Sequence, residues 1–178
     1  MCNNHDIIVY HGSTSLIKAV DVTKGKPYKD FGRGFYVTES KSHAGNLALR
    51  NKRIEKERYG RSCDAYLYTY KMNKTRLLRF NLKEFLSADL DWLLFVIANR
   101  RARDRVHNFD VVIGPTANDD TMTVINAYLD ALYGEVGDED ALMTLLRNIR
   151  PDTLPKQIYF SNNDAVSTLI PEGKVERL

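Results

Sequence analysis

The sequence has few cysteines and no long hydrophobic run. Cys2 and Cys63 are the only cysteines, and two do not make the disulfide framework of a small secreted domain. His5 is the only histidine close to a cysteine in the sequence, so we predict no metal site. No apolar run reaches membrane-spanning length, and the first residues show no basic segment followed by an apolar one. These absences predict a cytoplasmic protein without a membrane segment.

The sequence also lacks a strong charge imbalance and any low-complexity linker. Its 26 basic and 23 acidic side chains give a net charge of +3, which permits a phosphate-bearing ligand. This surplus is smaller than that of a dedicated nucleic-acid binder. A chain of 178 residues can bury a sizeable core, and we expect one domain over residues 1–178.

Hydrophobic periodicity predicts strands that alternate irregularly with helices. We expect strands at 7–10, 35–38, 63–72, 76–81, 109–113 and 155–161. We expect helices at 42–58, 89–101, 121–133, 139–149 and 163–169. The irregular order favours an α+β fold with flanking helices over a doubly wound parallel sheet, and the helices 121–133 and 139–149 form a helical insertion.

Polar and glycine residues gather at the ends of two predicted strands. The buried strand 7–10 is followed by His11, which we expect at its end. Gly32 and Gly34 precede the strand 35–38 and allow a ligand to lie against the backbone. Tyr36 then lies near a strand end, where its ring can stack on a planar ligand. The alternative is a glycine-rich turn before a core strand.

A third polar group follows the predicted strand 109–113. It consists of Asn118, Asp119 and Asp120. Loop residues at such a position often carry out chemistry, although Asn118 or Asp119 can equally cap the next helix. Both interpretations stay open at this point.

Three of these segments together resemble a known superfamily. Tyr-His-Gly-Ser at 10–13, Gly-Arg-Gly-Phe-Tyr-Val-Thr at 32–38 and Gln-Ile-Tyr-Phe at 157–160 resemble the His, Tyr and Glu motifs of the ADP-ribosyltransferases, in the diphtheria-toxin and poly(ADP-ribose) polymerase branch. Ala-Asn-Arg at 98–100 and Gly-Pro-Thr-Ala-Asn-Asp-Asp at 114–120 are similar to a bacterial domain of unknown function placed in that superfamily. The resemblance covers most of the chain. It implies a split, antiparallel-rich sheet of the ADP-ribosyltransferase type.

The resemblance also implies an NAD site. His11 would hold the adenosine-side ribose through its 2′-hydroxyl, and the backbone of Gly12 would pair with the nicotinamide carboxamide. Tyr36 would line or stack on the nicotinamide ring, and Ser42 would bond the carboxamide. The predicted cofactor-binding set is completed by Ser13, Gly34 and Thr38.

Two departures from the motifs bear on catalysis. The second pocket tyrosine is missing, with His43, Asn46 and Leu47 in its region. Gln157 stands where most of the superfamily has glutamate, and its amide can bond a ribose hydroxyl but cannot lend negative charge to an oxocarbenium ion. The loop 118–120 is an alternative source of that charge. The predicted catalytic residues are therefore Gln157, Asn118, Asp119 and Asp120.

The sequence leaves several functions open. The first is an NAD-dependent mono-ADP-ribosyltransferase that acts on a macromolecule, protein or nucleic acid, as a bacterial toxin or effector with a neutralising partner. The second is a weak or inactive NAD- or ADP-ribose-binding module. The third is nucleic-acid binding through the clusters at 50–61 and 100–105, which no recognised module or base-stacking pattern accompanies. Under the first two, we expect His11, Tyr36 and Gln157 to face one cleft.

Overall fold

The fold is built on a mixed, mostly antiparallel sheet. The computed structural model describes residues 6–149 and 154–178, so Cys2 and His5 lie outside the described residues. The strands are β1 (Asp6–Ser13), β2 (Phe35–Thr38), β3 (Tyr66–Asn73), β4 (Leu82–Glu84), β5 (Val111–Pro115), β6 (Lys156–Phe160), β7 (Leu169–Pro171) and β8 (Glu176–Arg177). Their order is β4-β5-β6-β2-β1-β3-β7, and β8 pairs with β3. Because β4 and β5 run parallel while the other described pairs run antiparallel, the α+β prediction is confirmed.

Most of the described helices begin at side chains that cap free backbone N–H groups, whereas α5 (Glu139–Asn148) has no side-chain cap. Their bounds are α1 (Lys41–Tyr59), α2 (Lys74–Leu77), α3 (Leu90–Arg101), α4 (Asp119–Leu129), α5 (Glu139–Asn148) and α6 (Asn163–Val166), and Val22–Lys24 forms a 3-10 turn. Ser40 caps α1 by accepting from the His43 N–H, and Asp89 caps α3 in the same way. Gly60 ends α1 in the left-handed conformation that favours glycine.

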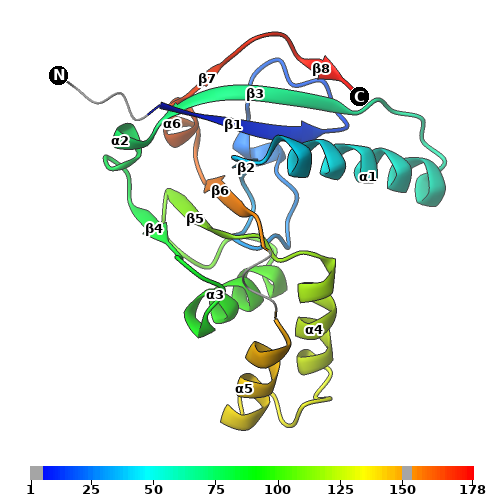
Figure 1. Cartoon of the computed structure of the whole chain (residues 1–178), viewed down its shortest axis with the longest axis vertical. Helices are drawn as coiled ribbons and strands as arrows, with labels where there is room; N and C mark the ends of the chain where they lie inside the picture. The colour runs from blue at the N-terminus through cyan, green and yellow to red at the C-terminus, as the bar shows by residue number, and fades with distance from the viewer. Residues whose placement is uncertain (1–5, 150–153) are drawn as a thin grey trace.

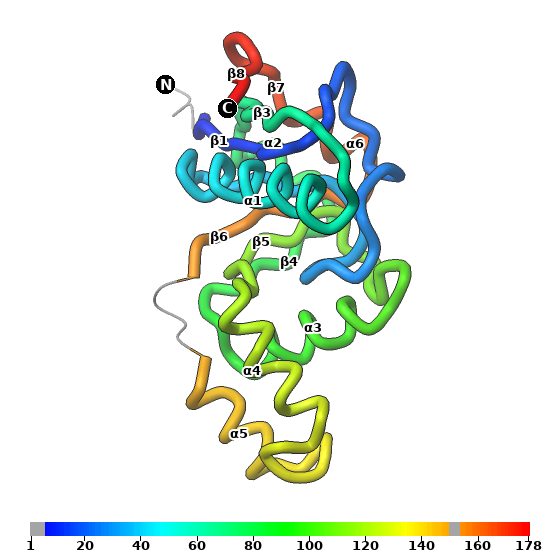
Figure 2. The backbone as a smooth tube through the Cα atoms, turned by 90° about the vertical axis from the view of Figure 1, so that its right-hand side faces the viewer, coloured from blue at the N-terminus to red at the C-terminus, as the bar shows by residue number. Residues whose placement is uncertain are grey.

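The helices divide between the two ends of the molecule. In Figures 1 and 2, α1 lies along β1 at one end, while α3, α4 and α5 gather at the other. Helices α4 and α5 lie between β5 and β6 in the chain, so both predicted helices are present, although α4 ends at Leu129 and not at residue 133. No helix in the described part of the chain is long and apolar enough to span a membrane.

Two hydrophobic clusters cover opposite faces of β2 and β6. Tyr36 and Tyr159 belong to the cluster under α3, α4 and α5. Their neighbours Phe35 and Phe160 belong to the other cluster, with residues of β1 and β3. Successive side chains of a strand point to opposite faces, so this division fixes which polar residues share a face.

Strand β1 joins the two halves of the sheet at a narrow seam. It pairs with β3 over its full length, from Asp6–Asn73 to Ser13–Tyr66. Its register with β2 consists of one pair, Tyr10 with Thr38, and we call this pair the seam. The strand continues through Ser13, so the prediction that His11 lies at the strand end is wrong.

Two local predictions near the chain's middle and end also differ from the structure. The strand predicted at 76–81 is wrong, because the Asn73 side chain accepts from the Arg76 N–H and starts the short helix α2. The helix predicted at 163–169 ends at Val166, and Leu169 begins β7, which pairs with β3. No element is predicted from the sequence near the chain end, where Glu176–Arg177 forms β8.

Candidate functional site

A buried carboxylate, Asp30, joins four segments of the chain. Its Oδ1 accepts from Nε of Arg100 at 2.7 Å, and Nη2 of Arg100 lies 2.5 Å from the same oxygen. Its Oδ2 accepts from the Ala117 N–H at 3.0 Å and from Nε2 of Gln157 at 2.7 Å. The Asp30 side chain is 5% exposed, so burial and charge pairing occur together. We call these four residues the Asp30 network.

The local structure explains how the Asp30 network assembles. Arg100 lies in the last turn of α3, Ala117 follows β5, and Gln157 pairs with Gly114 across β5 and β6. Gly32 has φ +91, and a Cβ there would lie 2.7 Å from the Arg105 Cβ. Only glycine fits this turn, which brings the chain from Asp30 into β2.

The Asp30 network orients the side-chain amide of Gln157. Nε2 donates to Asp30 and lies 3.4 Å from the Pro115 carbonyl, and both partners are acceptors, which fixes the nitrogen. Among the described residues, no hydrogen bond reaches Oε1. The carbonyl oxygen therefore has no donor in the part of the protein that the structure describes, within a side chain that is buried. A glutamate here would face the Asp30 carboxylate, which gives a physical reason for glutamine at this position.

Tyr36 shares a face with Gln157, as the strand pairs Tyr36–Tyr159 and Thr38–Gln157 show. Its hydroxyl donates to the Gly32 carbonyl at 2.5 Å, and its ring centroid lies 5.1 Å from that of Tyr159. Burial raises the pKa of Tyr36 well above its ordinary value, and the charge of Asp30 raises it further. Tyr36 is thus a neutral phenol held in place by its neighbours.

Thr38, the third polar residue on this face, ties β2 to its surroundings. Its hydroxyl donates to the Lys156 carbonyl at 2.7 Å and accepts from the Ser40 N–H at 3.2 Å. These bonds fix the end of β2 against the start of β6 and the cap of α1.

His11 approaches the β2 backbone as a neutral ring. Its Nδ1 lies 2.6 Å from the Tyr36 carbonyl, which can only accept, so we assign the ring proton to Nδ1. The ring stacks on Phe35 with centroids 4.3 Å apart. Burial lowers the pKa of His11 to about 4, although the bond to Tyr36 opposes this shift. At neutral pH, Nε2 is therefore an acceptor.

His11 lies on the opposite face of the sheet from Gln157. Tyr10 pairs with Thr38, and Thr38 pairs with Gln157, so these three share a face. His11 is the next residue of β1 and stacks on Phe35 in the other cluster. The prediction that His11, Tyr36 and Gln157 face one cleft is wrong for His11. The His11 ring lies near the seam on the face opposite to Gln157.

The predicted cofactor-binding glycines lie where backbones pack closely. A Cβ at Gly12 would lie 2.0 Å from the Ala44 carbonyl oxygen of α1. A Cβ at Gly34 would lie 2.3 Å from the Phe160 carbonyl oxygen. Helix and strand packing thus requires both glycines, and their proposed ligand contacts stay predictions.

The hydroxyls of the two predicted serines, Ser13 and Ser42, make only local hydrogen bonds among the described residues. The Ser13 hydroxyl accepts from the Ser15 N–H at 3.0 Å in the turn that follows β1. Ser42 is exposed in the first turn of α1, with its hydroxyl 3.2 Å from that of Ser40. Neither contact tests the role in NAD binding, which also stays a prediction.

The loop 118–120 is occupied by capping and by a surface ion pair. Oδ1 of Asn118 accepts from the N–H and the hydroxyl of Thr121, both at 2.8 Å, so capping is the role seen for Asn118. Asp119 pairs with Arg50 at 2.8 Å and is 70% exposed. Asp120 is exposed in the first turn of α4. The carboxylate that contacts Gln157 belongs instead to Asp30.

Asp30 and Arg100 are the polar residues that the sequence analysis does not assign to the site. A signal was present, because three residues of the Asp30 network belong to segments quoted for the resemblance and Asp30 lies close to a fourth. Asp30 lies two residues before Gly32, Arg100 ends Ala-Asn-Arg, and Ala117 lies in the segment 114–120. A carboxylate and a guanidinium in or beside separate quoted segments suggest an ion pair, although sequence alone does not bring them together.

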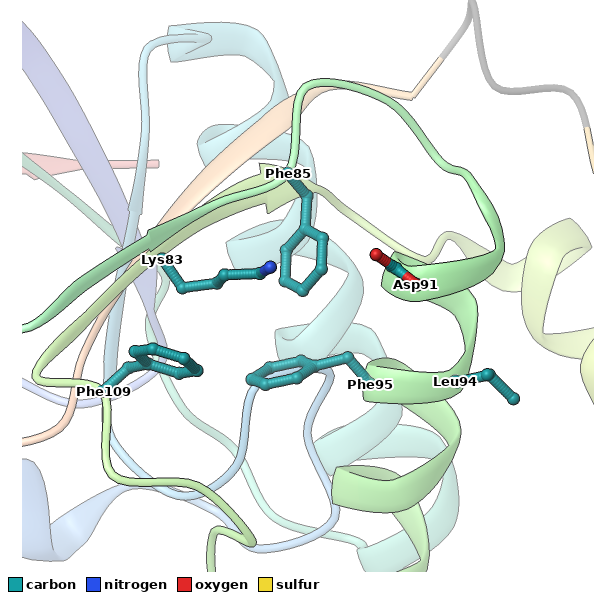
Figure 3. Close-up of a pocket in the computed structure, with 6 residues that line it drawn as sticks. All are labelled: Lys83, Phe85, Asp91, Leu94, Phe95 and Phe109. Atoms are coloured by element: carbon teal, nitrogen blue, oxygen red, sulfur yellow. The ribbon is translucent and has the colours of Figure 1, made fainter.

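A separate pocket of about 270 Å³ lies between β4 and α3. Figure 3 shows its aromatic walls, with the Lys83 ammonium beside the Phe85 ring at 4.9 Å from the centroid. It is lined by Lys83, Phe85, Asp91, Leu94, Phe95 and Phe109. None of the predicted site residues lines it. Among the described residues, no group of three or more metal-ligating side chains is present.

The fold and the Asp30 network define an α+β protein with a buried, ion-paired polar site beside the seam of an open sheet. A family model described as "Protein of unknown function (DUF3990)" matches residues 7–170, and the chain belongs to this family. No curated protein and no solved structure matches the chain.

Proposed function

We propose that this protein is an NAD-dependent mono-ADP-ribosyltransferase of the ADP-ribosyltransferase type, acting in the cytoplasm on a macromolecular acceptor. The observation that carries the proposal is the orientation of Gln157. Asp30 holds its amide nitrogen, which leaves the carbonyl oxygen available on the face that Tyr36 shares. The motif segments around His11, Tyr36 and Gln157 support the same function.

The proposed reaction breaks the bond between the nicotinamide nitrogen and the ribose carbon of NAD. Nicotinamide leaves with the electron pair, a nucleophile of the acceptor bonds to the ribose carbon, and its proton passes to water. Gln157 would accept a hydrogen bond from the nicotinamide-side ribose and hold it for attack. By the resemblance, His11 would accept from the adenosine-side ribose through Nε2. Because its ring lies on the other face of the sheet from Gln157, this contact requires NAD to pass the seam, where β1 and β2 share one residue pair. A neutral amide stabilises positive charge less than a carboxylate does, so we expect slow turnover.

A specific observation favours the second function, a binding module with weak or no catalysis. The Asp30 carboxylate lies next to Gln157, but Arg100 neutralises its charge and three groups donate to it. The site therefore holds a negative charge that is already compensated. His11 also lies on the other face. Both features are compatible with NAD binding and unfavourable for stabilising an oxocarbenium ion.

Thermal unfolding in the presence of NAD tests both functions. A ligand at a hundred times its dissociation constant stabilises a fold by about 2.7 kcal/mol, so NAD should raise the melting temperature. Gln157→Ala and His11→Ala should lose most of this shift, while the matched surface variant Asp119→Asn should keep it. The absence of any shift at millimolar NAD, in folded wild-type protein, would contradict both functions.

A further inference from the structure

The positive charge of the protein is concentrated on two segments that contact each other. Residues 15–34 and 98–108 contain nine basic and three acidic side chains, a surplus of six, whereas the whole chain has a net charge of +3. The remaining residues therefore carry a net charge of −3. We call these two segments the basic face.

Three contacts join the two segments of the basic face. Arg100 pairs with Asp30, Arg33 lies 4.0 Å from Asp104, and Gly32 packs against Arg105. The segments of the basic face therefore include Asp30 and Arg100, the ion pair that also contacts Gln157.

Several cations of the basic face have no compensating anion. In the part of the chain that the structure describes, no carboxylate lies within 4 Å of Lys26, Lys29, Arg101 or Arg103. Burial lowers the pKa of Lys29, and the positive charges of Arg100, Lys26 and Arg50 lower it as well, against the opposing effect of Asp30. Such crowding of like charges is unfavourable in the free protein and is relieved by a bound polyanion.

An exposed aromatic residue lies next to two of these cations in the sequence. Tyr28 has φ +59, a left-handed conformation that is rare for a residue other than glycine, and it is 51% exposed. It lies between Lys26 and Lys29, two residues before Asp30. Aromatic rings between cations stack on the bases of single-stranded nucleic acids, while the cations contact the phosphates.

We infer that the basic face binds single-stranded nucleic acid, with a base stacked on Tyr28 and phosphates held by Lys26, Lys29, Arg101 and Arg103. The bound nucleic acid is then the acceptor of ADP-ribose. This acceptor assignment rests on the proposed function. A nitrogen or hydroxyl oxygen of the strand then bonds to the ribose carbon, nicotinamide leaves with the electron pair, and the proton passes to water.

The basic cluster of α1 is less suited to this role. Glu55 and Glu57 are interleaved with its cations, and Glu55 lies 3.6 Å from Arg61. Arg50 is paired with Asp119. The positive charges of the α1 cluster are therefore partly compensated by carboxylates of the protein.

Fluorescence anisotropy with labelled single-stranded DNA and RNA of mixed sequence tests the basic face. We expect binding that weakens steeply with salt. Tyr28→Asn should weaken it by about tenfold through loss of stacking, and Tyr28→Phe should restore it. Asparagine tolerates the left-handed backbone, so the fold should persist. Lys26→Glu and Arg103→Glu should each lower the slope of log affinity against log salt by about 0.7.

Matched variants outside the basic face serve as controls. Tyr59 is 59% exposed at the end of α1, and Lys174 is an exposed lysine far along the chain. Tyr59→Asn and Lys174→Glu should change affinity less than twofold. Equal losses in the control variants, no binding at low salt, or tighter binding of poly-glutamate than of nucleic acid would overturn the inference.

The acceptor step is tested separately from binding. Labelled NAD should transfer its label to the bound strand, and Tyr28→Asn should reduce this transfer. Label that enters protein but not nucleic acid would overturn the acceptor assignment while the proposed function stands. Absence of any nicotinamide release would overturn the proposed function and the acceptor assignment together. Binding of nucleic acid to the basic face is tested independently, by the anisotropy measurement.

Discussion

Asp30 and Asp119, the carboxylate found beside Gln157 and the one predicted there, differ in burial and in partners. Asp30 is 5% exposed and accepts from Arg100, Ala117 and Gln157, whereas Asp119 is 70% exposed and pairs with Arg50 alone. A buried charge is stable only when its partners replace water, and a surface pair gains little because water screens it. The comparison shows that proximity to a strand end is a weaker guide to the site than burial with a full set of partners.

Replacing each carboxylate by its amide should give the largest contrast. Asp30→Asn leaves the half-buried Arg100 without a counter-ion, and we expect a loss of about 3 kcal/mol in the free energy of unfolding. Asp119→Asn should cost less than about 1 kcal/mol. Urea unfolding of both variants measures this. Equal losses would contradict the distinction between the two regions.

His11 extends the comparison, because it is a buried titratable group without a charged partner. Its effect on the free energy of unfolding should depend on pH. Burial lowers the pKa of His11 from 6.5 to about 4 in the folded state, so the unfolded state binds the proton more readily between these values. The contribution of His11 is fully present above pH 6.5 and is lost as the pH falls toward 4, by about 3 kcal/mol. Chemical unfolding of wild type and His11→Gln from pH 4 to 8 checks this. His43 and His107 also have lowered pKa values, and they act equally in both proteins.

A smaller effect is expected from a carboxyl group placed beside Asp30. Gln157→Glu removes the donor to Asp30 and adds a like charge, so we expect a loss of about 2 kcal/mol at pH 7. The pKa of the introduced carboxyl should be raised, so the loss should shrink as the pH falls and the group becomes protonated. In the Asp30→Asn background the loss should also be smaller, as a double-mutant cycle by urea unfolding would show. Full additivity would mean that the two groups do not interact.

Much of the fold follows from local sequence, whereas the polar site depends on pairing between distant segments. The helices at 42–58, 89–101 and 139–149 were predicted because apolar spacing and terminal residues act within one helix. The strand predicted at 76–81 failed because the Asn73 cap was not recognised. The carboxylate beside Gln157 was sought in the loop 118–120, since order along the chain does not show that Asp30 turns back toward β6.

Nicotinamide release from NAD by purified protein tests the central claim, that Gln157 held by Asp30 is the reacting end of an NAD site. The account predicts slow release by the wild type, a roughly ten- to hundredfold lower rate in Gln157→Ala, and an unchanged rate in Asp119→Asn. Release at the background rate by wild-type protein that binds NAD, or an equal rate in Gln157→Ala, would contradict it.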